Sequence, residues 1–347
     1  MSIEREEFDP QGDTLIVIPE KSVTVGQLGW LQSAAESQPE YHFLCSKKHL
    51  STASRRAHKV LSGGFKESIP DESDGLHHWT IQPIFDPHAW KIVLRIIHGR
   101  NRDIPRTVTV EQLAGIAAIV DDLECHEAVW FFSQGWLPQP PYASQIFTTQ
   151  DTARLILIAF VFEQPEMFQY ATQRAVVESL PLSFGAGVPI RPIILEHIKE
   201  QRDAVVESLL EGLKQIQTQL LEKKLGCNFG CRAMLLGTLI QKMDIRPLRL
   251  FSAALPLPLE SQSIDTIIRS LREDQPTIYY SPREQSIEGK RLKEWFSSDR
   301  YHTAKIPRTL VSHTCGLEEF IDPLLQTAER EAKGLQLVDY QESEHRT

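Results

Sequence analysis

The sequence predicts an α+β domain, with a small sheet flanked by helices, followed by a mostly α-helical domain. The first half alternates short β-branched and aromatic runs with helical periodicity, whereas the second half shows helical periodicity throughout. Between the halves, the segment SQGWLPQPPYASQIFTTQ contains three prolines, which is typical of an interdomain connection. We therefore expect a domain at 10–135, a linker at 136–150, a helical domain at 151–325 and a disordered polar tail at 326–347.

Three strands are predicted in the first domain. Residues 13–18 (DTLIVI) form a β-branched apolar run that follows a glycine and is closed by Pro19. Residues 41–45 (YHFLC) form a second apolar run, and residues 78–83 (HWTIQP) alternate apolar and polar side chains. This spacing predicts a sheet whose strands are separated by helical segments.

Helices are predicted between and after these strands. Ser46 and Ser54 are suited to cap two short consecutive helices, because a serine hydroxyl accepts a backbone N–H at a helix start. Asp86 followed by Pro87 predicts another helix start, and Gly99 its end. Further helices are expected at 110–120, 123–132, 152–162, 167–180 and 192–225, the last with a break near Gly212, and a turn or extended linker at 255–260.

Several blocks of the first half, in this order, resemble the BTB/POZ domain, in particular the uncharacterised BTB proteins that are abundant in fungi. These blocks are Gly12-Asp13, FLCSKKHLSTAS, LSGGFKES, DPHAWKIVLRIIHGR and VEQLAGIAAIVDDLECHEAV. The resemblance covers roughly residues 10–135, and the second half is similar to the helical extensions that follow BTB domains in that group. It implies a protein-protein interaction module that associates with copies of itself or with other proteins.

The sequence departs from the family pattern in two places. Many metazoan BTB domains have a histidine where this chain has Ser46. The lead before the first predicted strand is about ten residues, whereas strand-swapped BTB dimers generally use a longer segment. Whether the chain forms a homodimer therefore stays open.

The stretch LSGGFKES could be a phosphate-binding loop or the end of a helix. A phosphate loop needs the spacing GxxxxGK[ST] after a strand, and this stretch follows a helical pattern without that spacing. We therefore expect Gly63 or Gly64 to take a left-handed conformation that ends the helix.

The resemblance to BTB domains implies a role for the residues that follow the two glycines. In BTB adaptors of cullin-RING ubiquitin ligases, a hydrophobic-x-Glu motif in this loop helps to engage the cullin, and Phe65-Lys66-Glu67 matches its pattern. The resemblance thus implies that Phe65 and Glu67 contact a cullin while the helical half binds a client protein. The alternative is that Phe65 packs under the loop and Glu67 is solvated.

Four potential metal ligands form two pairs in the second half. Cys227 and Cys231 would share one face of a helix, and His313 and Cys315 would share one face of an extended segment. A closed set of three cysteines and one histidine suits a structural zinc ion. The alternative is that the cysteines pack as small apolar residues, which is common for this residue type.

Composition and motifs narrow the function classes. The formal net charge of −9 argues against nucleic-acid binding, because phosphates are neutralised by clustered Lys and Arg. The N-terminal segment MSIEREEFDP has no apolar core of a secretory signal, and the chain has no run long enough for a membrane span, so we expect a cytoplasmic or nuclear protein. No GxSxG, HExxH or GxGxxG motif occurs, and we expect no enzymatic activity.

Two functions remain. The first is a non-catalytic interaction module that serves as a substrate adaptor for a cullin-RING ubiquitin ligase. The second is an oligomerising scaffold or transcription-regulatory cofactor that does not bind a cullin and whose helical domain is stabilised by zinc.

Overall fold

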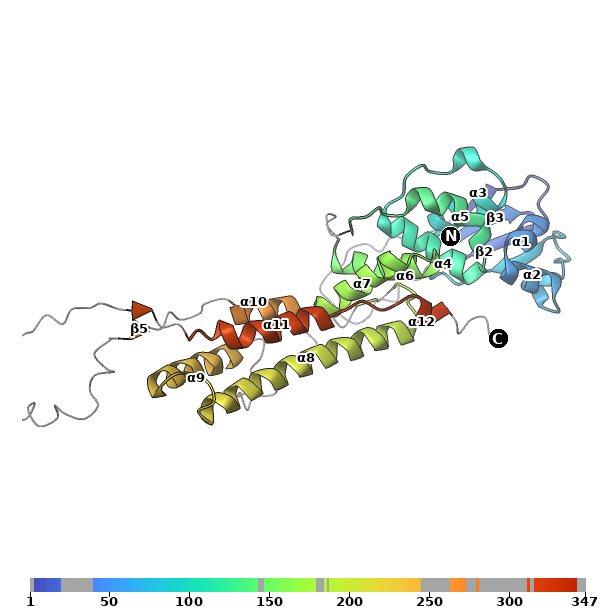
Figure 1. Ribbon diagram of the computed structural model, residues 1–347. Helices are drawn as coiled ribbons and strands as arrows, with labels where there is room; N and C mark the ends of the chain where they lie inside the picture. Colours follow the sequence, from blue (N-terminus) through green and yellow to red (C-terminus); the bar gives the residue numbers. More distant parts are fainter. Residues whose placement is uncertain are drawn as a thin grey trace, which may run out of the picture. The chain divides into compact units, whose positions relative to one another are not determined.

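The computed structural model describes residues 3–19, 40–142, 147–178, 184–185, 187–244, 263–272, 279–280, 311–312 and 315–341. The chain divides into two compact units (Figure 1). The first comprises Met1–Ala175, Ser183–Leu195 and Gly334–Thr347, and the second comprises Val176–Leu182 and Glu196–Lys333. No helix in the described part of the chain combines the length and apolar composition needed to cross a bilayer.

A four-stranded mixed sheet lies in the first unit, with the strand order β1-β3-β2-β4. Its strands are β1 Ile3–Glu7, β2 Thr14–Ile18, β3 Glu40–Cys45 and β4 His77–Thr80. Strand β3 is antiparallel to β2 and parallel to β1, and β4 is parallel to β2. The three predicted strands are confirmed as β2, β3 and β4, and the α+β layout is confirmed with them.

The core of the sheet runs across three strands. Ile16 of β2 pairs in register with Phe43 of β3 on one side and with Trp79 of β4 on the other. Side chains of directly opposed residues share a face of the sheet. Ile16 and Phe43 are fully buried and Trp79 is 3% exposed, so this row is part of the apolar core of the first unit.

Strand β1 was not expected, because its sequence IEREE has no apolar alternation. Backbone pairing with β3 and ion pairs to a helix hold it in place. Lys91 pairs with Glu4, and Arg95 pairs with Glu6 at 2.9 Å. Both cations belong to helix α3 (Pro87–Ile97). Electrostatic contacts between distant residues of this kind leave no periodic signal in the sequence.

Several helices of the first unit begin at a side-chain cap. Ser54 accepts the N–H of Ala57 at the start of α2. Asp86, directly before Pro87, accepts the N–H groups of His88 and Ala89 at the start of α3. The sequence predicts both caps. The helical elements of this part are α1 Lys47–Ala53, α2 Arg55–Ser62, η1 Lys66–Ser68, α3, η2 Asn101–Asp103, α4 Val110–Leu123 and α5 His126–Trp136.

The first unit continues past the predicted linker. Helices α6 Thr149–Val161 and most of α7 Pro165–Val177 belong to it, and α6 packs along α4. Thr148 and Asp151 form a capping box at the start of α6. The expected boundary at 136–150 therefore does not separate the two compact units.

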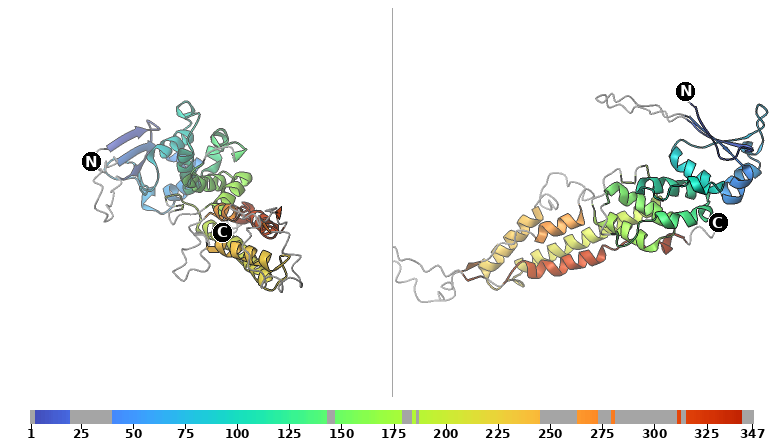
Figure 2. Two further views of the ribbon diagram at one scale, coloured as in Figure 1. Left: turned by 90° about the vertical axis from the view of Figure 1, so that its left-hand side faces the viewer. Right: turned by 90° about the horizontal axis from the view of Figure 1, so that it is seen from above.

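The second unit contains most of α8 Pro192–Leu221, together with α9 Phe229–Asp244, α10 Ile264–Arg272 and α11 Glu318–Glu331, and a two-stranded pair of β5 Tyr279–Tyr280 and β6 Val311–Ser312. The expected break of α8 at Gly212 is wrong, since the helix is continuous. A Cβ at Gly212 would lie 2.3 Å from Cδ1 of Leu324, so the glycine permits close approach of α11, which runs beside α8 in Figure 2. The predicted turn at 255–260 lies outside the described residues.

The disordered tail expected at 326–347 is also corrected, as far as the chain is described there. Helix α11 continues to Glu331, and α12 (Val338–Gln341) follows. Leu337 and Tyr340 are buried, and Tyr340 contacts Phe168 with ring centroids 5.8 Å apart. The segment looks polar in sequence because only a few of its side chains face the core.

Candidate docking loop and thiol cluster

The stretch after α2, residues 63–70, is called the docking loop below. Gly63 ends α2 with φ of −85° and ψ of −165°, and Gly64 likewise lacks a positive φ, so the predicted left-handed conformation is wrong. The glycine is needed for a different reason. A Cβ at Gly63 would lie 2.4 Å from the carbonyl oxygen of Lys59, which accepts the N–H of Gly63.

Phe65 begins a short 3-10 turn and stays exposed. Its carbonyl oxygen accepts the N–H and the hydroxyl of Ser68, at 3.0 and 2.6 Å. The ring leans toward Gly63, with Cδ2 3.2 Å from the position that a Cβ would take there. Phe65 is nevertheless 53% exposed, so the interpretation that it packs under the loop is wrong.

Glu67 is half-buried, and its backbone is anchored to the sheet. His77 of β4 donates from Nδ1 to the carbonyl oxygen of Glu67 at 3.1 Å. This tautomer leaves Nε2 as an acceptor for the ammonium group of Lys47, 3.4 Å away. Among the described residues, no ion pair is formed by the Glu67 carboxylate.

One further residue of the docking loop was missed in the sequence. Ile69 is 69% exposed, on the C-terminal side of the turn that Phe65 begins. The signal was present, because Ile69 is an apolar residue directly before Pro70 in a polar stretch. Phe65 and Ile69 are thus two exposed apolar residues of the docking loop, with Glu67 between them in sequence.

The second candidate site, the thiol cluster, consists of Cys227, Cys231 and Cys315. Their sulfur atoms all lie within 4.8 Å of one another, and this group could hold a metal ion. The sequence-based grouping of these three cysteines is thus confirmed. His313, the fourth predicted ligand, lies outside the described residues, and its role stays a prediction.

The electrostatics of the thiol cluster disfavour loss of its protons when no cation is present. Burial and the neighbouring Cys231 and Cys227 raise the pKa of Cys315 to about 11. A bound cation would reverse this effect by stabilising the thiolates. Burial is also the largest cause that raises the pKa of the first unit's cysteines, to about 12 for Cys125 and well above its usual range for Cys45.

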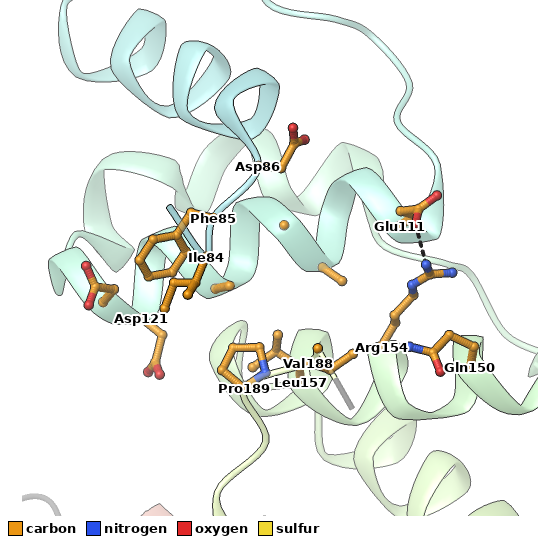
Figure 3. A pocket seen from close by; sticks show the side chains of 15 residues that line it. Ile84, Phe85, Asp86, Glu111, Asp121, Gln150, Arg154, Leu157, Val188 and Pro189 are labelled. Atoms are coloured by element: carbon orange, nitrogen blue, oxygen red, sulfur yellow. Dashed lines mark hydrogen bonds and ion pairs between the residues drawn. The ribbon is translucent and has the colours of Figure 1, made fainter. Parts of the chain in front are cut away.

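A cavity of about 730 Å³ lies in the first unit, lined by residues of α4 and α6 (Figure 3). Its apolar walls include Ile84, Phe85, Leu157, Val188 and Pro189. At one end Arg154 pairs with Glu111 and with Asp151. At the other end Asp121 lies 3.4 Å from Arg191. Since these charges are paired, the cavity offers mainly apolar surface, and it contains none of the residues predicted as a site.

Comparison of the sequence with protein families and with curated proteins does not assign the chain to a family. No protein-family model matches the chain, and no curated protein matches it. The resemblance to BTB/POZ domains therefore rests on the sequence blocks quoted above. The α+β architecture, the exposed docking loop and the thiol cluster are what the structure itself provides.

Proposed function

We propose that this chain is a non-catalytic protein-protein interaction module that binds a partner through the docking loop. The exposure of Phe65 on an anchored loop carries this proposal. Large aromatic side chains supply much of the binding energy in interfaces when a partner pocket buries them. Since the Gly63 N–H bonds to the carbonyl oxygen of Lys59 and His77 anchors the carbonyl oxygen of Glu67, little ordering entropy opposes binding.

We propose a cullin as that partner, with the chain acting as a substrate adaptor of a cullin-RING ubiquitin ligase. The support is the BTB-like order of blocks in the first half and the hydrophobic-x-Glu pattern of Phe65 and Glu67. In this mechanism Phe65 fills an apolar pocket and the Glu67 carboxylate fixes orientation. The helical half would bind the client protein.

Affinity purification of the tagged full-length chain from its native cells tests the proposal, with partners identified by mass spectrometry. Wild type should retain a cullin, and Phe65→Asp should lose it, because a carboxylate placed in an apolar pocket is desolvated without compensation. We expect the affinity to fall by about 30-fold or more, the level of an interface hot spot. Ile69→Asp should weaken binding in the same direction.

Phe131→Asp is the matched control. Phe131 is 75% exposed on α5 of the same unit, so the substitution makes the same chemical change outside the docking loop. This variant should retain the cullin. If wild type retains no cullin, or if both phenylalanine variants lose it equally, the docking-loop proposal is overturned.

A second candidate is an oligomerising scaffold or transcription-regulatory cofactor without cullin binding, with a zinc-stabilised helical unit. The thiol cluster favours it, because a structural metal ion is one way to rigidify helices for assembly. Light scattering coupled to size-exclusion chromatography distinguishes a homodimer from a monomer. A stable homo-oligomer whose copurifying proteins include regulators and no cullin would favour the scaffold.

A further inference from the structure

Three chain segments meet at the thiol cluster. Cys227 lies in the turn after α8, Cys231 in the first turn of α9, and Cys315 three residues before α11. Cys315 is 84 positions beyond Cys231, so only the fold brings it to the other two. The three segments belong to the second unit.

The spacing of the sulfur atoms suits a tetrahedral thiophilic ion. An ion with sulfur ligands at about 2.3 Å holds the sulfur atoms about 3.8 Å apart in tetrahedral geometry. The upper limit of 4.8 Å in the cluster exceeds this by about one ångström, which small side-chain rotations can close. Thiolate ligands select zinc or copper(I) over magnesium or calcium.

Gly226 and Asn228 shape the turn that carries Cys227 and leads to Cys231. Gly226 has a φ of 81°, which favours glycine, and a Cβ there would lie 2.7 Å from Cγ of Arg232. Asn228 contacts both cysteines. Its Oδ1 accepts the N–H of Cys231 at 2.8 Å, and its Nδ2 donates to the Cys227 sulfur at 3.3 Å. An amide donor aimed at a sulfur atom stabilises the thiolate and orients it for a metal.

Packing as small apolar residues does not account for this arrangement. Cys231 is buried, but Cys227 is exposed and Cys315 is partly exposed. An exposed cysteine gains little from burial of its apolar surface. Metal coordination explains why all three sulfur atoms converge despite their different exposure.

We propose that Cys227, Cys231 and Cys315 bind one zinc ion as thiolates, that Asn228 positions the first two, and that the ion fastens the start of α11 to the α8–α9 turn. The inference goes beyond the docking proposal and does not depend on it. The described residues provide three ligands, which leaves the fourth position to water or to another ligand. The ion closes the chain between Cys231 and Cys315 into a loop, and such closure restricts the unfolded state.

The test is metal analysis of the full chain after expression in zinc-replete medium. Wild type should contain one zinc ion per chain. Cys227→Ser, Cys231→Ser and Cys315→Ser should each retain less than about a tenth of that amount, since a lost thiolate greatly weakens such a site. Cys125→Ala, which removes a buried thiol of the first unit, should keep the full amount. Asn228→Ala should still bind zinc, with affinity about 10-fold lower or more.

A measurement on the wild-type chain tests the inference even if the variants fail to fold. Zinc removal by a chelator should increase hydrogen exchange near residues 226–231 and 315–318, and added zinc should reverse the increase. Cobalt(II) added to the metal-free chain should give sulfur-to-cobalt charge-transfer absorption, which Cys125→Ala should preserve. A metal-free wild type, a disulfide within the cluster, or full zinc content in Cys315→Ser would overturn the inference.

Discussion

The hydroxyl group of Ser54 donates a hydrogen bond of 2.5 Å to the carbonyl oxygen of Leu123, a residue 69 positions away in the chain. The same side chain accepts the N–H of Ala57 at 2.9 Å and so caps α2. Ser54 is 1% exposed. One buried hydroxyl therefore joins the start of α2 to the end of α4, and α2 leads directly into the docking loop.

Replacement of Ser54 by alanine removes both hydrogen bonds. We expect Ser54→Ala to lower the free energy of unfolding by about 2–3 kcal/mol, since a lost helix cap and an unsatisfied buried carbonyl each cost about 1 kcal/mol or more. Urea denaturation monitored by circular dichroism measures this. Ser46→Ala is the control, because its capping bond to His49 is long, at 3.5 Å, and exposed. An equal loss in both variants would contradict the role of the Leu123 contact.

His98 makes the stability of the first unit depend on pH. Its Nε2 accepts the N–H of Ser46 at 3.0 Å, and its Nδ1 donates to the carbonyl oxygen of Leu94 at 2.8 Å. Burial lowers the pKa of His98 below its ordinary value of 6.5, and the nearby His49 and Arg100 act in the same direction, while the bond to Leu94 and the charge of Asp9 oppose it. The neutral ring is therefore the native form.

Because the folded pKa of His98 is lower than the unfolded one, the unfolded chain binds more protons in the window between the two values. This contribution to stability is present above pH 6.5 and is lost as the pH falls from 6.5 to the folded pKa. We expect the free energy of unfolding to decrease from pH 7.5 to pH 5 in wild type, and His98→Asn to show a weaker decrease from a lower starting value. The control His88→Asn, at an exposed position, should show the same pH dependence as wild type. If the free energy of unfolding of His98→Asn fell with pH as steeply as that of wild type, the mechanism would be ruled out.

Gly212 provides a test of close helix packing in the second unit. A side chain at this position meets Leu324, whose Cδ1 would lie 2.3 Å from the new Cβ. We expect Gly212→Leu to lower the free energy of unfolding by about 1–3 kcal/mol through overpacking, although leucine favours helices more than glycine by nearly 1 kcal/mol.

A double-mutant cycle separates the two effects. In the Leu324→Ala background the space is vacant, so Gly212→Leu should cost less there, or stabilise the helix, than it does in the wild-type background. Thermal unfolding of the four proteins measures the coupling. Additive effects would mean that Gly212 and Leu324 are not in contact.

The residues of α12 contribute to the core of the first unit. Tyr340 is 6% exposed and contacts the ring of Phe168. We expect Tyr340→Ala to lower the free energy of unfolding by about 1–3 kcal/mol, below the usual cost of a core aromatic because a terminal element can fray separately. Val338→Ala, at a residue 57% exposed on the same helix, should have little effect. Hydrogen exchange in α7 should rise in the tyrosine variant alone.

The strands and caps of the first unit could be predicted because their signals are local. The apolar run at β2 and the caps Ser54 and Asp86 each determine the conformation of residues next to them. Strand β1 could not be found in this way. Its backbone pairs with β3, and its Glu4 and Glu6 pair with Lys91 and Arg95, more than 80 positions later.

For the two candidate sites too, the identity of the residues could be predicted, whereas their arrangement in space could not. The resemblance to BTB adaptors pointed to Phe65 and Glu67, whereas residue types and spacing pointed to the three cysteines. The exposure of Phe65 depends on how the whole loop packs, and the approach of Cys315 to Cys231 depends on the complete fold of the second unit. Neither can be read from neighbouring residues.

The return of the chain to its first unit has a consequence for synthesis on the ribosome. Leu335 donates its N–H to the hydroxyl oxygen of Thr172 at 2.8 Å, and Tyr340 covers Phe168. At about 5–20 residues per second, translation from Ala175 to Tyr340 takes roughly 8 to 33 seconds. During that interval Phe168 of α7 lacks the cover of Tyr340 on the nascent chain, and transiently exposed apolar surface of this kind is what chaperones bind.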